Sequence, residues 1–472
     1  MKILLSNPPF FKNFNRQVRW SAKTSGALHP PVYLAYAAAN LKKAGYDVLL
    51  VDAVALELTR DEFLERIEKF NPEIIVFETS TPSFLNDSEL VDMIKSRIDA
   101  KVVFTGSHAS ALPEDNLRMS KLDFVCIGEY EGTLVELAEH LKNKKTLKNV
   151  KGLAYKDRNG EIRINKPRPL IEEIDKLPWP LREQLPTEKY RDTLLTAPFT
   201  FIVTARGCPY YCTYCNWPYT MFGHKIRPRG TKDVVDEVEH CIKKHKLKTY
   251  KFFDDTFTAD RKHVIAICNE LIKRGIKTPW ICNARVDTLD EETMILMKKA
   301  GCYLYKVGVE SGNQKILNWI RKGTTIQQIK KFFKTTKKVG MQTFASFMIG
   351  YPEETKETIK QTFDLAKEIE PDMVQFVILQ PLPGTPLYSW MAEREMLPEN
   401  IEWDKYLTSE GFVDIVFKHP KFSQEEMRQI CSKLWKGYYL RPRYITKRIF
   451  MGLKSPREMK KNIHGIKKIF RY

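Results

Sequence analysis

Short runs of consecutive apolar residues alternate with helix-like stretches through the first 140 residues of the chain. The strand-like runs are rich in β-branched residues and cover 1–9, 47–53, 73–81, 101–107 and 122–129. The amphipathic stretches between them cover 33–46, 61–70, 88–98 and 133–143. Apolar strands that alternate with helices are typical of a parallel sheet covered on both faces. Residues 1–140 are therefore predicted to form a doubly wound, Rossmann-like α/β domain.

Polar and small residues follow the predicted strands of this domain. Ligands of doubly wound sheets bind beyond the carboxyl ends of the strands, so binding residues are expected in these loops. The candidates are Asn7, Pro8, Thr79, Ser80, Gly106, Ser107, His108, Gly128 and Glu129.

A second strand–helix series begins near residue 199. Its predicted strands are 200–205, 249–254, 279–284, 303–310, 343–350 and 372–379, and each is followed by a helical stretch. Six units are two short of a closed TIM barrel, so residues 197–400 are predicted to form a partial (β/α)6 barrel with an open side. The linking residues 141–196 suggest a hairpin and a proline-rich connector, and residues 401–472 suggest a helical C-terminal tail.

The net charge of +19 is concentrated at the end of the chain. Residues 433–472 hold thirteen Lys and Arg against one acid, Glu458, which gives +12. Within this tail, residues 435–453 interleave aromatic, aliphatic and basic side chains, as a segment that contacts anionic lipid does. A solvated basic helix packed on the barrel has the same composition, so both interpretations stay open.

The location of the protein is predicted from what the sequence lacks. No run reaches the roughly 18 apolar residues of a membrane span. The amino terminus has no small-residue cleavage site of the kind that follows a signal peptide. We therefore expect a cytoplasmic protein, with peripheral membrane contact through the tail as an added hypothesis.

Three of the nine cysteines lie close together, in the run TARGCPYYCTYC after the first barrel strand. Cys208, Cys212 and Cys215 are separated by three and two residues. A structural zinc ion takes four ligands, and a ferredoxin-type [4Fe–4S] cluster takes four cysteines. Since no fourth ligand follows at a suitable spacing, three thiolates on a four-iron cluster would leave one iron open.

This spacing resembles the signature of the radical S-adenosylmethionine (SAM) superfamily, with Tyr214 at its aromatic position. The resemblance implies that the open iron of a [4Fe–4S] cluster chelates SAM. An external donor of the flavodoxin or ferredoxin type then supplies the electron that cleaves SAM to methionine and a 5′-deoxyadenosyl radical.

Other strand-end residues are similar to SAM-contacting positions of that superfamily. Together with Tyr214, the predicted SAM contacts are Asp254, Asp255, Arg285, Glu310, Ser311, Gly350 and Glu353. For any one of them, a strand-end cap or a barrel-rim ion pair is an alternative role, because structural ion-pair networks also gather charge.

The N-terminal sheet ahead of such a barrel resembles the cobalamin-binding subclass of the superfamily. That resemblance implies cobalamin as a third cofactor, contacted by the strand-end residues of the first domain named above. No Asp-x-His-x-x-Gly motif is present, so the protein is not expected to ligate cobalt through a histidine. The alternative is a docking domain without a cofactor.

Two reactions follow from the resemblance. The first is cobalamin-dependent C-methylation of an unactivated carbon, and the second is radical cyclisation, oxidation or C–C joining. Aromatic residues late in the chain favour an apolar or amphipathic substrate, such as a lipid or a tetrapyrrole: Trp390, Trp403, Tyr406, Trp435, Tyr438 and Tyr439. We assign no general acid or base.

An RNA-modifying enzyme is the least favoured alternative. RNA-methylthiolating relatives carry three further cluster cysteines in their first domain, whereas the first 200 residues here hold only Cys126. The basic charge also lies in the tail rather than along the barrel, so no nucleic-acid partner is expected.

Overall fold

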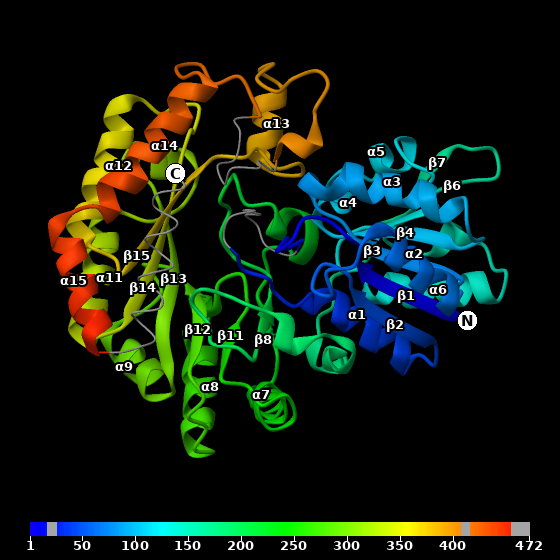
Figure 1. Ribbon diagram of the computed structural model, residues 1–472, viewed down its shortest axis with the longest axis horizontal. Coiled ribbons are helices and arrows are strands. Elements are labelled where there is room, and N and C mark those ends of the chain that lie inside the picture. Colours follow the sequence, from blue (N-terminus) through cyan, green and yellow to red (C-terminus); the bar gives the residue numbers. More distant parts are fainter. Residues whose placement is uncertain (17–25, 407–415, 455–472) are drawn as a thin grey trace.

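The computed structural model describes residues 1–16, 26–406 and 416–454, and Figure 1 shows two parallel sheets side by side. The N-terminal sheet lies on one side and the barrel on the other. The carboxyl-terminal part of the predicted tail, residues 455–472, lies outside the described residues.

The N-terminal sheet is doubly wound, as predicted. Its parallel strands are ordered β2-β1-β3-β4-β5. Helices α1 and α6 cover one face, while α2, α3 and α5 cover the other. The bounds are β1 (Lys2–Asn7), α1 (Val32–Lys43), β2 (Asp47–Asp52), α2 (Arg60–Phe70), β3 (Ile74–Glu78), α3 (Phe84–Lys95), β4 (Lys101–Thr105), α4 (Ser107–Ala111), α5 (Pro113–Arg118), β5 (Phe124–Cys126) and α6 (Glu131–Lys142).

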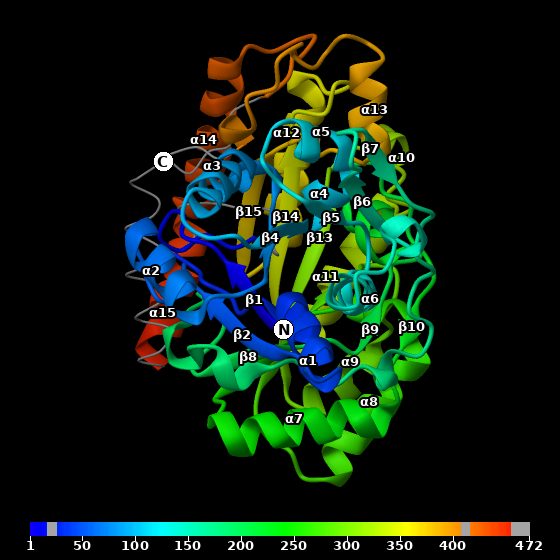
Figure 2. The same ribbon diagram turned by 90° about the vertical axis from the view of Figure 1, so that its right-hand side faces the viewer.

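The hairpin of the predicted connector extends this sheet. Strand β6 (Leu153–Lys156) pairs antiparallel with β5, and β7 (Ile162–Ile164) pairs antiparallel with β6. In Figure 2 the extended sheet lies in front of the barrel. The hairpin thus belongs to the N-terminal sheet by hydrogen bonding, whereas the domain boundaries proposed from the sequence remain a prediction.

Six parallel strands in sequential order form the second sheet, which confirms the partial barrel. The strands are β8 (Phe199–Ile202), β11 (Thr249–Phe252), β12 (Trp280–Ala284), β13 (Cys302–Glu310), β14 (Gln342–Ile349) and β15 (Met373–Ile378). The helices are α7 (Thr231–His245), α8 (Arg261–Lys273), α9 (Glu291–Lys299), α10 (Gln314–Trp319), α11 (Ile326–Val339), α12 (Lys356–Ile369) and α13 (Pro386–Ala392). Local signals set their limits: Thr325 and Gln328 form a capping box at the start of α11, which ends at a left-handed Gly340.

Aromatic side chains cover the β15 edge of the open barrel. The Tyr439 hydroxyl, on α14 (Gln424–Tyr439), donates to the carbonyl of Val374 at 2.6 Å and accepts from its N–H at 2.9 Å. The Trp435 indole donates to the carbonyl of Phe376 at 2.9 Å. An exposed strand edge can pair with another chain. The contacts of Tyr439 and Trp435 cover the β15 edge in this way.

The late aromatic residues also make contacts within the protein. Besides the two on the β15 edge, Tyr438 donates to the carbonyl of Pro371 at 2.7 Å, and Tyr406 donates to that of Pro381 at 3.0 Å. Trp403 is buried against His108. These contacts give most of the late aromatic side chains a structural role, and the substrate class inferred from them stays a prediction.

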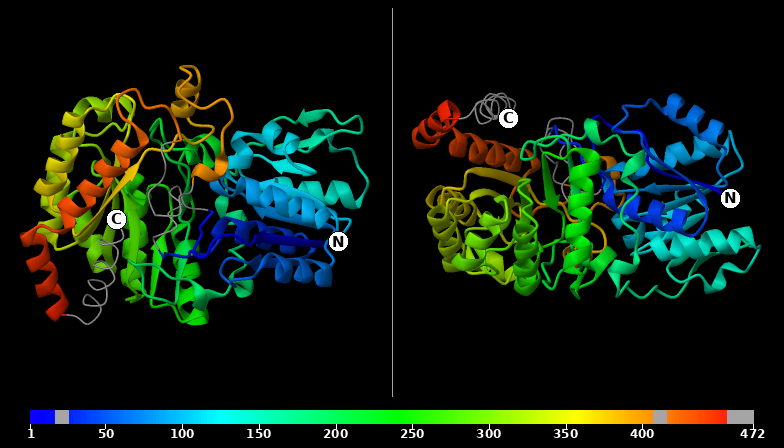
Figure 3. Two further views of the ribbon diagram at one scale, coloured as in Figure 1. Left: turned by 45° about the horizontal axis from the view of Figure 1, so that its top comes forward. Right: turned by 90° about the horizontal axis from the view of Figure 1, so that it is seen from below.

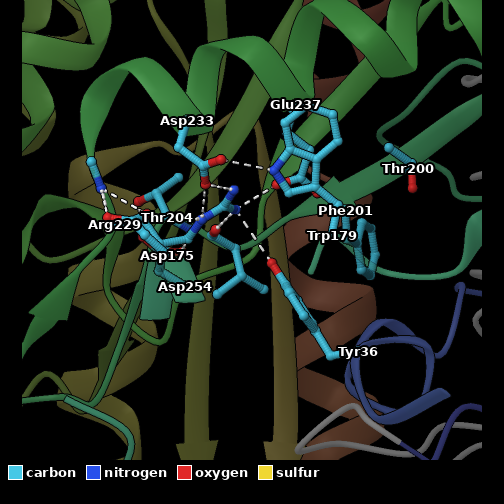
Figure 4. Close-up of polar contacts among 12 residues, drawn as sticks. Tyr36, Asp175, Trp179, Thr200, Phe201, Thr204, Arg229, Asp233, Glu237 and Asp254 are labelled. Atoms are coloured by element: carbon cyan, nitrogen blue, oxygen red, sulfur yellow. Dashed lines mark hydrogen bonds and ion pairs between the residues drawn. The ribbon is translucent and has the colours of Figure 1, made fainter. Parts of the chain in front are cut away.

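Arginines bind the opposite edge, at β8, where the N-terminal domain docks. Arg182 donates to the carbonyl of Phe201 at 2.8 Å, and Arg229 donates to that of Val203 at 2.7 Å. Figure 4 shows Arg229 between Asp233 and Glu237 of α7 and the hydroxyl of Tyr36 from α1. Because Tyr36 belongs to the first domain, this buried network joins the two sheets.

Candidate active site

The three cysteines lie in the loop that leaves the first barrel strands. Gly207, just before Cys208, has a φ of 90°, and an added Cβ would lie 2.1 Å from the carbonyl oxygen of Lys225. Only glycine fits this close approach. Cys208 and Cys212 are buried, Cys215 is half-buried, and all three line a cavity of about 200 Å³.

The cavity suits a cluster better than a single metal ion. Across the described ranges, no three His, Cys, Asp or Glu side chains come together around one metal ion. A structural zinc ion needs such a closed set of ligands. Three thiols from one loop facing one cavity fit the three-cysteine ligand set of a [4Fe–4S] cluster with an open iron.

Five of the eight residues predicted to contact SAM line this cavity with the cysteines: Tyr214, Asp254, Asp255, Arg285 and Glu310. The other three do not belong to its lining. Ser311 is buried, and its hydroxyl lies 3.2 Å from that of Thr362. Gly350 follows β14 with a φ of 91°, and Glu353 is exposed.

The buried carboxylate of that loop is Glu354, one residue beyond the one predicted. Its Oε2 accepts hydrogen bonds from the N–H groups of Gly350 at 2.6 Å and Tyr351 at 3.1 Å. Burial raises its pKa to about 8, although these two hydrogen bonds act in the opposite direction. The sequence places two glutamates side by side and gives no signal of which one turns inward.

An ion pair closes one side of the cavity. Glu310 accepts from the Lys322 ammonium at 3.0 Å, and the same ammonium lies 3.4 Å from the hydroxyl of Tyr214. Glu310 has a φ of 68°, at an irregularity in the β13–β14 register. A Cβ on Gly308 would lie 2.2 Å from Glu310 Oε1 and 2.9 Å from the Lys322 ammonium. A side chain at position 308 would therefore displace this ion pair.

Asp254 and Arg285 both have partners within the chain. Asp254 accepts from the N–H of Thr204 at 2.6 Å and from the Thr204 hydroxyl, as Figure 4 shows. Burial raises its pKa to about 7. Arg285 donates two hydrogen bonds to Asp287, at 3.0 and 2.9 Å, and its guanidinium lies over the ring of Tyr210. Its Nε and Nη2 are thus paired with Asp287, although the side chain lines the cavity.

Sequence reasoning missed the polar side chains of the barrel interior. Lys251, Asn283, Lys306, Ser346 and Gln375 line the same cavity. Each lies within a strand rather than at a strand end. The available signal was a polar residue recurring inside otherwise apolar strands, since alternate strand positions face the barrel interior.

The residues predicted to contact cobalamin gather at the carboxyl ends of the N-terminal strands. Gly106 has a φ of 100°, and an added Cβ would lie 2.7 Å from the carbonyl oxygen of Thr79. Within the part of the chain that the structure describes, the buried Oδ1 of Asn7 has no hydrogen-bond partner. A cradle that excludes side chains and an unpaired acceptor fit a ligand lying across these loops.

Several of the residues predicted to contact cobalamin form hydrogen bonds or packing contacts within the protein. The Thr79 hydroxyl donates to Asp87 at 2.8 Å, and Ser80 Oγ lies 3.0 Å from Ser83 Oγ. His108 is buried between Phe84 and Trp403, and burial lowers its pKa to about 3. Its Nδ1 lies 3.2 Å from the hydroxyl of Thr81, so this histidine has packing and hydrogen-bonding contacts within the fold.

Glu129 holds the two domains together. Its carboxylate forms ion pairs with Arg206 at 3.3 Å and Arg227 at 2.8 Å, all with side chains at most 2% exposed. Arg206 also pairs with Glu131 at 2.6 Å. Because Arg206 precedes Gly207 and Cys208, this network fixes the cysteine loop to the N-terminal domain.

One segment separates the cysteine cavity from the N-terminal strand-end loops. Trp217 and Pro218 line the cavity. Four residues on, the sulfur of Met221 lies 3.6 Å from the hydroxyl of Ser110, which also accepts from the N–H of Gly128 at 2.9 Å. The two candidate cofactor regions are thus neighbours.

Comparison with known proteins decides the family. Residues 202–366 match the Radical SAM superfamily, and residues 20–138 match the B12 binding domain. A protein of Pyrococcus horikoshii described as an uncharacterized methyltransferase is 35% identical over 453 residues, which span 95% of each chain. This chain belongs to the radical SAM superfamily. With its B12-binding domain, this radical SAM enzyme uses a [4Fe–4S] cluster, SAM and cobalamin, which confirms the predicted cofactors.

Two further similarities concern the whole radical SAM enzyme. The anaerobic magnesium-protoporphyrin IX monomethyl ester cyclase of Rubrivivax gelatinosus is 28% identical over 452 residues, covering 93% of this chain and 78% of the cyclase. The structure of the cobalamin-dependent SAM radical enzyme OxsB, with aqua-cobalamin and SAM bound, matches with a TM-score of 0.76 at 18% identity. That match covers 98% of this chain and 71% of OxsB, and it confirms the fold.

Proposed function

We propose that this radical SAM enzyme methylates an unactivated carbon of a small molecule, with cobalamin as the methyl carrier. The proximity of the cysteine cavity to the N-terminal strand-end loops carries the proposal, because a radical site and a methyl donor must act on the same carbon. The P. horikoshii relative also supports this proposal, because it is described as a methyltransferase and is similar to this chain over nearly its full length.

The barrel would hold the cluster and SAM, and the N-terminal domain would hold cobalamin. When bound, the cluster and SAM supply a 5′-deoxyadenosyl radical that removes a hydrogen atom, and cobalamin supplies the methyl group. Cys208, Cys212 and Cys215 would hold the cluster. Asn7 and Gly106 are the predicted cobalamin contacts whose environments in the structure fit a ligand. The remaining predicted contacts stay predictions.

The packing of the barrel favours radical chemistry. The cavity lies inside a barrel whose two open edges are covered by α14 and by the N-terminal domain. Exclusion of water and of stray hydrogen donors protects a reactive intermediate. No proton transfer is needed at the carbon attacked, so we assign no general acid or base.

Radical cyclisation or oxidation is the second candidate. The similarity to a protoporphyrin ester cyclase over 93% of this chain favours it. The two reactions differ in product mass. Comparative mass spectrometry of metabolites from strains with and without the gene should show a product heavier by one methylene unit. A product that differs by the loss of two hydrogens would overturn methylation in favour of cyclisation.

A lipid or a tetrapyrrole is the proposed substrate class, and an external flavodoxin- or ferredoxin-type protein is the proposed electron donor. We propose no nucleic-acid partner. Anaerobic SAM cleavage assays with a reduced flavodoxin and a reduced ferredoxin would identify the donor. An enzyme that neither protein reduces would contradict this assignment.

Helix α15 (Pro442–Lys454) supports peripheral contact with a membrane by a cytoplasmic protein. Ile445, Ile449 and Leu453 are 40%, 54% and 71% exposed at intervals of four residues, and Phe450 is 66% exposed. Basic side chains lie among them, as in helices that bind anionic lipid. Figure 3 shows this helix on the side of the barrel away from the N-terminal sheet. In the described part of the chain, no helix is long and apolar enough to span a bilayer.

Vesicle co-sedimentation tests this contact. A variant with Ile449→Glu and Phe450→Glu should bind phosphatidylglycerol vesicles less than the parent chain. The control is Ile295→Glu, because Ile295 is an equally exposed residue on α9. Unchanged binding by the double variant would remove the membrane hypothesis.

A further inference from the structure

A buried carboxylate joins the segments that follow two strands of the N-terminal sheet. Asp87 lies in the first turn of α3, and the Arg16 guanidinium donates to its two oxygens at 3.3 and 2.7 Å. Both side chains are 0% exposed. The hydroxyls of Thr79 and Ser83 donate to the same carboxylate, each at 2.8 Å. Asp87 therefore connects the segment after β1 with the segment after β3.

These hydrogen bonds lead to residues that are predicted to contact cobalamin. The Arg16 guanidinium also donates to the carbonyl of Pro8 at 3.0 Å. The Oγ of Ser83 accepts from the N–H of Ser80 at 3.1 Å and lies 3.0 Å from its Oγ. Thr79 is bound by the carboxylate directly. Predicted contacts from two strand ends are thus held by one buried acid.

The same network reaches the end of β2. Asn7 and Asp52 lie opposite one another in the β1–β2 register. Burial raises the pKa of Asp52 to about 6, while the charge of Arg16 and a hydrogen bond from the Asn7 side chain act in the opposite direction. The Asp52 carboxylate also accepts from the hydroxyl of Tyr190 at 3.0 Å. Asn7, whose buried Oδ1 has no hydrogen-bond partner in the described part of the chain, is therefore held in place as well.

Asp87 is placed to orient these groups rather than to bind a ligand itself. An ionised carboxylate accepts hydrogen bonds at about four lone-pair positions. The amide of Asn86 donates to Asp87 at 3.1 Å, and with the bonds from Arg16, Thr79 and Ser83 it takes up these positions. Because a threonine hydroxyl has one hydrogen, its donation to the carboxylate leaves the Thr79 oxygen as an acceptor.

We propose that Asp87 is a positioning residue of the cobalamin site, which together with Arg16 holds the loops after β1 and β3 in the arrangement that binds this cofactor. Binding groups act together only where packing and hydrogen bonds fix their relative positions. The proposal rests on the proposed function for the place of cobalamin at these loops. It adds that a side chain remote from the ligand sets the affinity for it.

Cobalamin affinity tests this role. The full chain, reconstituted anaerobically with iron and sulfide, is dialysed to equilibrium against hydroxocobalamin, and the bound fraction is measured by absorbance. Asp87→Asn keeps the shape of the side chain but removes its charge, and it should weaken cobalamin binding about tenfold or more. The affinity of the same variant for SAM should stay within about twofold of the parent value, because none of the described residues that line the cysteine cavity belongs to this network.

The matched control is Asp92→Asn, because Asp92 lies on the same helix with a side chain that is 51% exposed. Ser83→Ala is a milder variant: it detaches Ser80 from the carboxylate while the buried ion pair stays intact, and it should weaken cobalamin binding about threefold or more. Its control is Ser96→Ala, at the exposed carboxyl end of α3. Circular dichroism confirms that each variant is folded. If Asp87→Asn does not fold, Ser83→Ala decides.

Cobalamin affinity equal to that of the parent chain in the folded variants would overturn the proposal. So would a parallel loss of cobalamin and SAM binding, because that pattern indicates general damage to the fold. These results are separable from the fate of the proposed function. A chain that methylates its substrate while Asp87→Asn binds cobalamin normally would keep its function and lose this role. Conversely, the expected binding defects in a chain whose product carries no added methyl group would leave this role intact and defeat the proposed function.

Discussion

Replacing Arg206 by methionine should destabilise the protein. Arg206 is 1% exposed and pairs with Glu131 at 2.6 Å and Glu129 at 3.3 Å. Glu129 would keep Arg227 at 2.8 Å, whereas no other ion pair holds Glu131 within the described residues. Breaking a buried ion pair from one side costs about 3–5 kcal/mol, because a charge is left without compensation. Because the unfolding entropy of a chain of 472 residues is about 1 kcal/mol/K, the melting temperature should fall by roughly 3–5 °C.

Thermal unfolding of the reconstituted full chain measures this change, and iron content measures its consequence for the adjacent cysteine loop. Arg163→Met is the control, since the Arg163–Asp157 pair is exposed and should leave the melting temperature unmoved. Adding Glu131→Gln to Arg206→Met removes the stranded charge and should recover at least half of the loss. A melting temperature equal to that of the parent chain in Arg206→Met, or no recovery in the double variant, would refute the reasoning.

Two further predictions concern Glu354 and Gly308. Folding raises the pKa of Glu354 from 4.5 to about 8, so the folded chain binds this proton more tightly and loses stability as the pH rises from 5 to 8. Glu354→Gln should flatten this part of the melting-temperature profile, and a profile parallel to that of the parent chain would contradict the assignment. Gly308→Ala should displace the Glu310–Lys322 pair and weaken SAM binding about tenfold, measured by equilibrium dialysis, since its Cβ would lie 2.2 Å from Glu310 Oε1. Gly132→Ala is its control, because an added Cβ there would come no closer than 3.5 Å to Arg168 and the position has no positive φ; equal affinity in the two variants would count against the clash.

The element order was predictable because strand and helix periods alternate cleanly along the chain. The sheet pairing of the hairpin was not, since β6 and β7 are short and their partner β5 lies more than 25 residues away in sequence. The cysteine triad was predictable because its information is entirely local.

Side-chain direction limited the prediction of the site. Glu353 and Glu354 are adjacent and chemically alike, and only the folded loop turns the second one inward. Arg285 has the donor fork of a carboxylate ligand, but Asp287, two residues along, occupies that fork. Lys306 was missed because a charged residue within a strand is normally taken to face solvent, whereas a barrel has an interior face.

SAM cleavage tests the cluster assignment most directly. The full chain, reconstituted anaerobically with iron and sulfide and then reduced, should convert SAM to 5′-deoxyadenosine and methionine, quantified by mass spectrometry. Cys212→Ala should form no 5′-deoxyadenosine above background, while Cys241→Ala, buried on α7 away from the cavity, should match the parent chain. Cleavage by Cys212→Ala at the parent rate, or none by the parent chain, would contradict the account.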